Sequence, residues 1–409
     1  MGLNTLPLSA GDLVDIDLVS LGAATGLLWR SGEATLVGVG AADHVSLSLS
    51  SGAADLADAL ESRRGKDELQ IPGSGPIAFS VLDFDRSATG VGIIAEIVVG
   101  EVDGQRFVTA PDTLEIAEVE ARAAVAIAEA SNAMPGRVQV ERGKSAVDWR
   151  DQVVTVARDR LRTSEMRKAV FARELVLEAD ADFPLARVVR DLDRRFPEAM
   201  VFSIDGFIGA SPELLVSRFG RTVRAHPLAG TASRSTDPEV DAERVDALRS
   251  SSKDRTEHQI TIDWLLAELL PFCSYVDAEP EPSVLSMANV HHLGTMVEGV
   301  LSAPPVSAVE LVAGVHPTPA LGGDPQAEAL ELIAELEGFD RSRYGGPAGW
   351  VDSVGNGEFA VSVRTAQVDG HQATVCAGVG VVAQSDPEAE LVETQAKFRA
   401  MLGSLLNPQ

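Results

Sequence analysis

Two pairs of acidic residues have a spacing that suits metal binding from helices. Asp254 and Glu257 lie three residues apart at the start of a segment that continues as an almost wholly apolar helix, so both carboxylates can face one site. Glu390 and Glu393 have the same spacing and share one side of a second helix with Lys397. Carboxylate oxygens are the ligands that Mg²⁺ prefers. The pattern is compatible with a magnesium site, and also with ordinary ion pairs along each helix, which the second helix taken alone favours.

Other metal and nucleotide motifs are weak. His291 and His292 are adjacent instead of four residues apart, and no pair of cysteines accompanies them, which argues against zinc. The Gly-x-Gly strings at residues 355–357 and 378–380 do not complete a dinucleotide fingerprint, and the sequence has no P-loop. Cys273 and Cys376 match no redox or metal spacing, so we expect two buried thiols.

The charge of the chain limits its partners. Acidic residues number 61 and basic residues 34, which gives a formal net charge of −27. Such a chain repels nucleic acid and anionic membrane surfaces, and we expect neither as a partner. A site for a small anionic substrate would need local cations or a metal. Because the sequence has no signal peptide and no apolar run long enough to span a membrane, we also expect a cytoplasmic location.

The elements that must position these residues alternate irregularly between strands and helices. Strands are predicted at residues 166–177, 200–210, 214–219, 359–368 and 372–382, and helices at 53–60, 111–130, 241–270, 325–337, 385–402 and from Ser145. Asp205-Gly206 predicts a hairpin, and Ser385 with Glu388 predicts a capping box. The pattern indicates an α+β fold with antiparallel sheets. The pattern of residues 1–110 predicts mainly short strands, and we expect this part to complete the sheets. The catalytic region is predicted at residues 111–409, and both parts are expected to form one structural domain.

Eight short motifs follow one another between about residues 160 and 402. They are GASPELL (209–215), HPLAGT (226–231), KDRTEH (253–258), VHPTPA (315–320), RYGG (343–346) with Trp350, VSVR (361–364), AGVG (377–380) and PEAELVET (387–394). In this order they resemble the motifs of chorismate-utilising enzymes, the family that includes isochorismate, salicylate, anthranilate and aminodeoxychorismate synthases. The resemblance implies large antiparallel sheets packed as a sandwich with flanking helices.

The resemblance also assigns roles at a site. It implies that Mg²⁺ bridges acidic side chains to the ring carboxylate of chorismate, with Glu257 and Glu390 as the principal ligands and Asp254 and Glu393 close by. This cation would make an anionic substrate tolerable in an acidic protein.

Two residues match the catalytic acid and base of the family. Glu213 would protonate the departing C4 hydroxyl, and it must stay protonated near neutral pH, which the apolar Leu214 and Leu215 and repulsion by nearby carboxylates would favour. Lys168 would activate the water that attacks C2. A lysine base must be partly neutral, which burial or cationic neighbours such as Arg167 and Arg173 would favour.

The remaining matches imply substrate contacts. Arg364 and Tyr344 would hold the enolpyruvyl carboxylate, Arg364 through a two-pronged contact. The other residues expected in the substrate pocket are Gly230, Thr231, His292, Ala320, Gly380 and Lys397.

Three residues help to distinguish among the activities known in the family. Ala229 replaces the lysine of the covalent type of aminodeoxychorismate synthase, and Lys168 replaces the neutral amide of ammonia-using anthranilate synthases, so no amidotransferase subunit is expected. Ala320 stands where salicylate synthases tend to have threonine. Isochorismate synthase, an isomerase, is therefore favoured. Salicylate synthase, an anthranilate-synthase-like subunit and a non-catalytic binding subunit remain as alternatives, and the product could serve menaquinone or siderophore biosynthesis.

Overall fold

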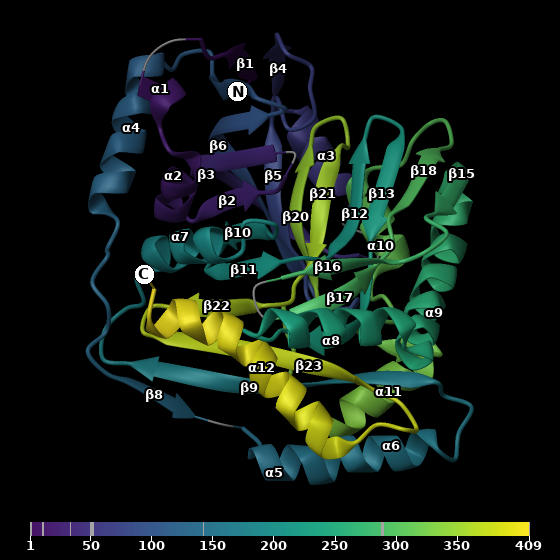
Figure 1. Ribbon diagram of the computed structural model, residues 1–409. Helices are drawn as coiled ribbons and strands as arrows, with labels where there is room; N and C mark the ends of the chain where they lie inside the picture. The colour runs from purple at the N-terminus through teal and green to yellow at the C-terminus, as the bar shows by residue number, and fades with distance from the viewer. Residues whose placement is uncertain are drawn as a thin grey trace.

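The computed structural model describes the chain except residues 1, 10–11, 33, 50–52, 142, 288–289 and 409, and it leaves the side chains of Asp12 and Lys253 undescribed. Two long strands, β3 (Ala34–Leu47) and β6 (Gly90–Val102), pair antiparallel along their whole length and join two sheets. Figure 1 shows the two sheets spreading from this pair.

The first sheet continues from β3 in a single series of antiparallel pairs. Its strands are, in spatial order, β2 (Leu27–Arg30), β10 (Met200–Ile204), β11 (Phe207–Ser211), β22 (Thr365–Asp369), β23 (Gln372–Val381), β9 (Lys168–Ala179) and β8 (Val138–Glu141). The second sheet continues from β6. Its strands are β5 (Ile77–Val81), β20 (Pro347–Asp352), β21 (Gly357–Val361), β12 (Leu214–Phe219), β13 (Thr222–His226), β18 (Val297–Leu301) and β15 (Cys273–Ala278).

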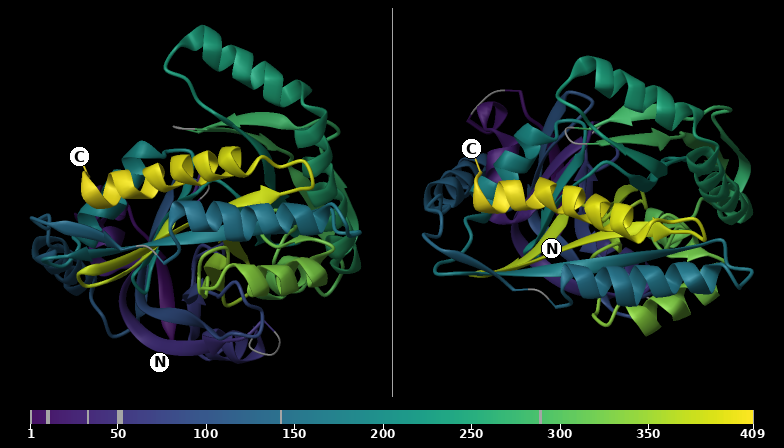
Figure 2. Two further views of the ribbon diagram at one scale, coloured as in Figure 1. Left: turned by 90° about the horizontal axis from the view of Figure 1, so that it is seen from below. Right: turned by 60° about the horizontal axis from the view of Figure 1, so that its bottom comes forward.

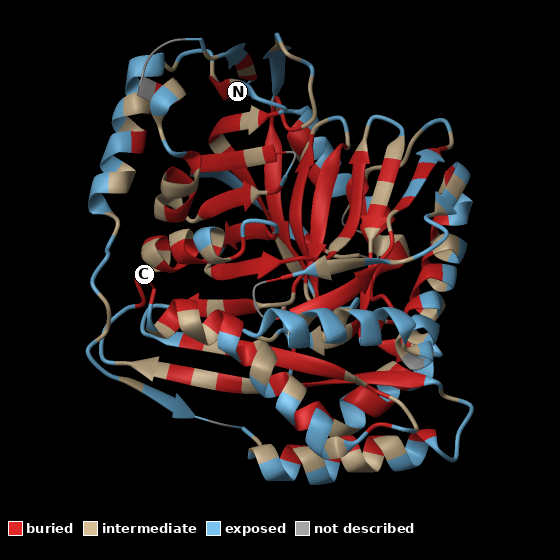
Figure 3. Ribbon diagram, viewed as in Figure 1, coloured by how far each residue is buried: buried red, intermediate tan, exposed pale blue. Residues whose placement is uncertain are grey.

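The core lies in three layers. Alternate strand residues point to opposite faces of a sheet, so Trp29 of β2 and Trp350 of β20 both belong to the layer between the two sheets. The outer face of the first sheet packs against α2 (Leu18–Thr25), α4 (Ile116–Glu129), α7 (Leu185–Arg195) and α12 (Pro387–Leu406). The outer face of the second packs against α3 (Ala53–Glu61), α9 (Ser252–Leu269) and α10 (Ala308–Val315). Figure 3 shows buried strands at the centre and exposed helix faces outside. The predicted fold is confirmed.

Other elements complete the frame around these layers. Beyond β6 the sheet continues through β7 (Gln105–Pro111) and β1 (Leu3–Pro7) to β4 (Arg64–Asp67), and the short strand β19 (Gly323–Asp324) pairs with the start of β9. A helical run, α5 (Ala146–Trp149), η1 (Arg150–Val154) and α6 (Thr155–Leu161), lies beside α12, and α11 (Gln326–Leu336) packs under β9. The short helices are α1 (Asp12–Asp15) and η2 (Leu270–Phe272).

A separate three-stranded sheet lies beside the second large sheet. It consists of β14 (Leu228–Ser233), β17 (Val290–Gly294) and β16 (Ser283–Ser286). The helices α8 (Pro238–Ser250) and α9 contact it, and Figure 2 shows α8 on the outside of the molecule. The HPLAGT motif runs into β14 and the KDRTEH motif lies on α9. The two motifs are therefore brought together where α9 contacts the small sheet.

Several predicted boundaries were wrong for local reasons. The helix expected at 241–270 is two helices, because Ser251 leaves the helical conformation and its side chain caps α9 at the Asp254 N–H. The strand expected at 359–368 is also two, β21 and β22. Helix α12 is capped by Asp386 and not by Ser385, whose hydroxyl instead accepts from the Val382 N–H. The strands β3 and β6 are long, not short.

Two further sequence expectations can be compared with the structure. Cys273 and Cys376 are both described, and both are buried free thiols, as expected. Among the described residues, every helix is too short or too polar to cross a membrane.

Candidate active site

Two chain crossings between the large sheets meet at one point. Strand β11 of the first sheet leads through Pro212 and Glu213 into β12 of the second, and β21 leads through Arg364 into β22 in the opposite direction. The crossings are tied together by the Val361 N–H, which donates to the Glu213 carbonyl at 3.0 Å, and by the Ala210 N–H, which donates to the Arg364 carbonyl at 3.2 Å. Arg364 has a φ of 56°, a left-handed conformation that breaks the strand. The predicted continuous strand fails here because it has to change sheets.

A cavity lies over these crossings. All of the predicted site residues line it except Asp254 and Glu390. Those that do are Lys168, Glu213, Gly230, Thr231, Glu257, His292, Ala320, Tyr344, Arg364, Gly380, Glu393 and Lys397. Residues separated by up to 229 positions in the sequence are thus brought to one cavity.

Lys168 is the first residue of β9, and its side chain is only 4% exposed. Its Nζ lies 2.6 Å from Oε1 of Glu257 on α9. Gly380 on the neighbouring strand makes room for it, because a Cβ there would lie 2.6 Å from Cε of Lys168. The expected cationic neighbours are elsewhere: Arg167 pairs with Asp324, and Arg173 lies over the rings of Trp149 and Phe398. The charged group that Lys168 contacts is an anion.

Glu213 is buried, and burial raises the pKa of its carboxyl from 4.5 to about 7. The Leu228 N–H, which donates to Oε1 at 3.4 Å, and the positive charges of Lys168, Lys397 and Arg364 oppose this rise. The predicted protonated acid therefore has a physical basis in desolvation. The expected repulsion by carboxylates is wrong, since the charges acting on Glu213 are cations.

His292 on β17 connects the small sheet to Arg364. Nη2 of Arg364 lies 2.9 Å from Nε2 of His292, and Nδ1 of His292 lies 3.1 Å from the Thr231 hydroxyl. Burial and the nearby Arg364 lower the pKa of His292 well below its usual value, so the ring is neutral near pH 7. Because the guanidinium can only donate, Nε2 must accept and Nδ1 must carry the proton. Nη1 of Arg364 is buried and has no hydrogen-bond partner among the described residues.

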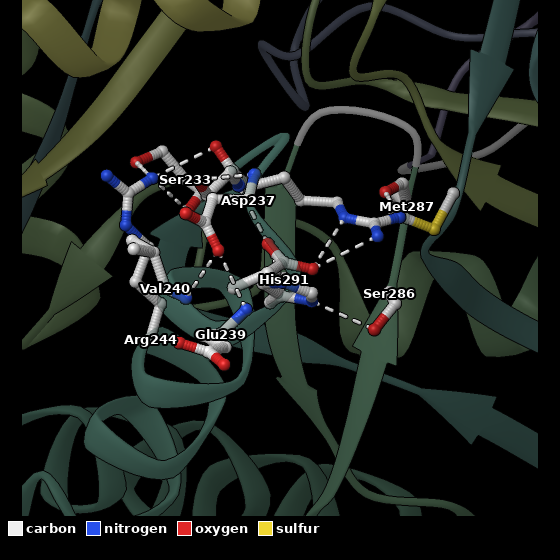
Figure 4. A network of polar contacts seen from close by, with 11 residues as sticks. Ser233, Asp237, Glu239, Val240, Arg244, Ser286, Met287 and His291 are labelled. Carbon is white, nitrogen blue, oxygen red and sulfur yellow. Dashed lines mark hydrogen bonds and ion pairs between the residues drawn. The ribbon is translucent and has the colours of Figure 1, made fainter.

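The opposite face of the small sheet is fixed by the polar network in Figure 4. Nε2 of His291 lies 3.1 Å from Oδ1 of Asp241 on α8, and its Nδ1 lies 2.8 Å from the Ser286 hydroxyl. Asp241 also accepts from the Ser235 N–H and from Arg234. Since neighbouring strand residues point to opposite faces, His291 anchors α8 while His292 faces the cavity. This agrees with the interpretation of adjacent histidines as satisfied polar groups and not as zinc ligands.

Helix α12 and the RYGG turn supply another wall. Lys397 donates to the Gly378 carbonyl at 2.8 Å and pairs with Glu393 at 2.8 Å. Tyr344 is buried with its hydroxyl against Gly378, and burial raises the pKa of its phenol. Its hydroxyl is therefore a neutral donor at all ordinary pH values.

The carboxylates of the cavity fit a hard cation by their chemistry. Glu257 and Glu393 reach the cavity from two helices, whereas Glu390 is buried on α12 and the Cβ of Asp254 packs against Gly230. Within the described part of the chain, no three acidic, histidine or cysteine side chains are grouped closely enough to hold a metal. Mg²⁺ usually takes only one or two protein carboxylates and completes its shell with water and substrate oxygens. Two glutamates facing a cavity satisfy that requirement.

Arg341 was missed by the sequence analysis. It is buried and lines the cavity, whereas Arg343, which belongs to the recognised RYGG motif, binds Asp205 and Gln367 outside the cavity. The sequence offered little signal for it, because Arg341 lies four residues beyond Glu337, the last residue of the helix predicted at 325–337.

Comparisons with known proteins agree with this geometry. The family model described as "Chorismate binding enzyme" matches residues 22–406. The chain is 39% identical over 257 residues to isochorismate synthase DhbC of Bacillus subtilis, covering 60% of this chain and 65% of the relative. It is 42% identical over 253 residues to a putative isochorismate synthase MenF of Mycobacterium tuberculosis, covering 59% and 68%. The first of these alignments thus spans less than two thirds of the relative.

Solved structures share the whole fold. A crystal structure of a putative 2,3-dihydroxybenzoate-specific isochorismate synthase, DhbC from Bacillus anthracis, matches with a TM-score of 0.80 and 30% identity over 96% of this chain and 98% of that chain. MenF, the menaquinone-specific isochorismate synthase from Escherichia coli, gives a TM-score of 0.80 at 23% identity, covering 99% and 95%, which concerns the fold alone. With a family model that spans nearly the entire sequence and a cavity at the crossing of its two sheets, this chain belongs to the chorismate binding enzyme family.

Proposed function

We propose that this protein is an isochorismate synthase, which isomerises chorismate by moving a hydroxyl group from C4 to C2. The observation that carries the proposal is the joint presence in one cavity of a buried lysine, Lys168, and a buried carboxyl, Glu213, whose pKa of about 7 leaves a substantial fraction of it protonated near neutral pH. An amine and a carboxylic acid are the base and the acid that this exchange requires. The relatives named as isochorismate synthases support the same activity.

The proposed reaction divides between these two residues. Lys168, which pairs with the Glu257 carboxylate as an ammonium group, must first lose a proton; as the free amine it then takes a proton from water while the water oxygen bonds to C2. The π electrons of C1=C2 move to C1–C6, those of C5=C6 move to C4–C5, and the C4–O bond breaks. Glu213 gives its proton to the departing hydroxyl, which leaves as water. One water is consumed and one is released, so the reaction is an isomerisation.

The anionic groups of the substrate are bound by other residues of the cavity. Arg364 has a buried nitrogen without a partner in the described chain, and such a donor is costly unless a ligand satisfies it. We assign it, with the Tyr344 hydroxyl, to the enolpyruvyl carboxylate. Glu257 and Glu393, the two candidate ligands that line the cavity, would hold Mg²⁺, whereas Glu390 and Asp254 do not line it. When bound, that ion would neutralise the ring carboxylate of chorismate.

The experiment is to incubate the purified protein with chorismate, with and without Mg²⁺, and to separate the products by chromatography. Isochorismate alone is the expected product. Salicylate together with pyruvate would identify a lyase instead, and absence of turnover would indicate a binding subunit. Glu213→Gln should abolish turnover while chorismate still binds, because the amide keeps the shape of the side chain but cannot supply the proton. Unchanged turnover would overturn the assignment of the acid.

A further inference from the structure

A buried ion pair in the cavity wall has no part in the proposed chemistry. Arg341 is 6% exposed and Glu337 is 3% exposed. Nε of Arg341 donates to Oε2 of Glu337 at 2.8 Å, and Nη2 donates to Oε1, so the contact is two-pronged. The guanidinium lies 4.2 Å from the centre of the Phe84 ring. The pair is therefore held in one orientation from several sides.

The pair also hydrogen-bonds to the backbone of two cavity walls. Nη2 of Arg341 donates to the Val170 carbonyl at 2.6 Å, and Oε1 of Glu337 accepts from the Ala172 N–H at 2.6 Å. Nη1 of Arg341 donates to the Leu321 carbonyl at 3.0 Å. Val170 and Ala172 follow Lys168 on β9, and Leu321 follows Ala320 in the loop before α11. One side-chain pair thus joins the strand of Lys168 to the Ala320 loop.

The positions of these contacts along β9 are informative. One edge of β9 pairs throughout with β23. On the other edge, β19 pairs only with Lys168 and Ala169, and β8 pairs only from Val176 onwards. Between them, the Val170 carbonyl and the Ala172 N–H would lack a strand partner, and the ion pair supplies an acceptor and a donor in its place. The pair thereby continues the ladder directly beside Lys168.

We infer that Arg341 and Glu337 are positioning residues that fix the register and direction of β9 so that Lys168 faces the substrate cavity. This inference rests on the proposed function of Lys168. A buried ion pair is weak evidence for stability in itself, because apolar replacements are often as stable. Its use at this place is geometric: a slip of β9 by one residue would turn Lys168 to the opposite face of the sheet.

The test uses Arg341→Lys, which keeps the charge but loses the planar fork, and Glu337→Gln, which keeps an oxygen acceptor for Ala172. The matched control is Asp191→Asn. Asp191 is 1% exposed and pairs with Arg194 and Arg195 on α7, outside the cavity. Each variant is assayed for kcat and KM with chorismate at a fixed interval below its own Tm, so that lost stability is matched.

For Arg341→Lys we expect kcat to fall by about 10- to 100-fold, the effect of displacing a reacting group by about 1 Å, with KM changed by less than about threefold. Asp191→Asn should lower Tm and leave kcat unchanged. If Arg341→Lys also lowered only Tm, the pair would be purely structural and the inference would be wrong. Should Arg341→Lys not fold, Glu337→Gln carries the same comparison.

A second readout does not depend on turnover. Acylation of Lys168 by an amine-selective reagent is quantified by peptide mass spectrometry, with the exposed Lys66 as an internal reference. The ratio of Lys168 to Lys66 should rise several-fold in Arg341→Lys and Glu337→Gln and stay constant in Asp191→Asn. If the wild-type protein made no isochorismate, the proposed function would fail, while an unchanged acylation ratio would separately overturn the positioning role.

Discussion

The side-chain amine of Lys168 lies 2.6 Å from Oε1 of Glu257, although the two residues are 89 positions apart in the sequence and come from a strand and a helix. Lys168 is proposed as the base and Glu257 as a magnesium ligand. The oxygen that would bind the metal is therefore also the one that contacts the Lys168 amine. The side chain of Lys168 is 4% exposed and that of Glu257 is 18% exposed. Removing either partner would leave a poorly solvated charge without its counterion.

A divalent cation and Lys168 should compete for Glu257. We expect added Mg²⁺ to increase the rate at which an amine-selective reagent acylates Lys168, because the carboxylate that covers the amine would be drawn to the metal. The rate is measured by peptide mass spectrometry relative to Lys66. Glu257→Gln should acylate quickly with or without Mg²⁺. If the acylation rate of Lys168 in the wild type did not change on addition of Mg²⁺, the ion would not bind at Glu257.

Removal of divalent cations with EDTA should abolish isochorismate formation, and added Mg²⁺ should restore it.

The raised pKa of Glu213 should affect stability in a defined pH window. Below its ordinary pKa of 4.5 the carboxyl is protonated in both the folded and the unfolded chain. Between 4.5 and about 7 only the folded chain keeps the proton, so the free energy of unfolding falls as pH rises through this window and is level above it. The loss is at most on the order of 3 kcal/mol.

Glu213→Gln should lack this loss, because an amide does not ionise. The Tm of Glu213→Gln relative to wild type should therefore increase from pH 4.5 to pH 7 and then stay constant, as measured by thermal denaturation in matched buffers. Asp352, another buried carboxyl with a pKa raised to about 6, is present in both proteins and cancels in the difference. A Tm difference that does not vary with pH would contradict the raised pKa.

The location of the site was largely predictable because its residues lie in local motifs. Glu213 and Arg364 were identified from the strings that surround them, and both line the cavity. The sequence analysis could not show which of these motifs lie next to one another in the fold. A strand pattern shows only which residues alternate between the two faces. The strand predicted at 359–368 therefore did not reveal the change of sheet at Arg364, which takes a backbone conformation that is uncommon for arginine.

Partners distant in sequence were also beyond prediction. The carboxylate that contacts Lys168 and the backbone groups that Arg341 binds belong to other elements, and no periodicity encodes such contacts. The expected cationic neighbours of Lys168 were chosen by nearness in sequence. Arg167 and Arg173 are one and five positions away, and an odd separation along a strand places a side chain on the opposite face. This rule could have excluded Arg173 before the structure was seen.

Arg364→Lys should weaken substrate binding more than it slows turnover. Lysine keeps the positive charge but offers a single point of contact in place of the planar fork, so the contact with the carboxylate and the bond to His292 cannot both be kept. We expect KM for chorismate to rise by about 10- to 100-fold, in line with about 2 kcal/mol or more for a buried charge contact, with a smaller change in kcat. Arg343→Lys is the control, because Arg343 binds Asp205 outside the cavity. Equal KM changes in both variants would remove Arg364 from the carboxylate site.

Gly380→Ala should reduce turnover mainly by displacing the Lys168 amine. The backbone of Gly380 has an ordinary conformation, so alanine adds no backbone strain, but its Cβ would lie 2.6 Å from Cε and 3.2 Å from Nζ of Lys168 and 3.3 Å from Oε1 of Glu257. These atoms belong to flexible side chains that can move, and the tightest contact is with Lys168, which predicts a folded protein with a displaced amine. We expect kcat to fall at least about tenfold, since misplacement of a reacting group by about 1 Å costs up to about 100-fold. Tm should change little, because the lysine side chain can move while the backbone of the strand stays in place.

Gly32→Ala is the matched control, because nothing lies within 4 Å of the added Cβ. It should leave kcat and Tm as in the wild type. Full activity in Gly380→Ala would mean that the position of the Lys168 amine does not limit the reaction, and the role of Lys168 as the base would have to be given up.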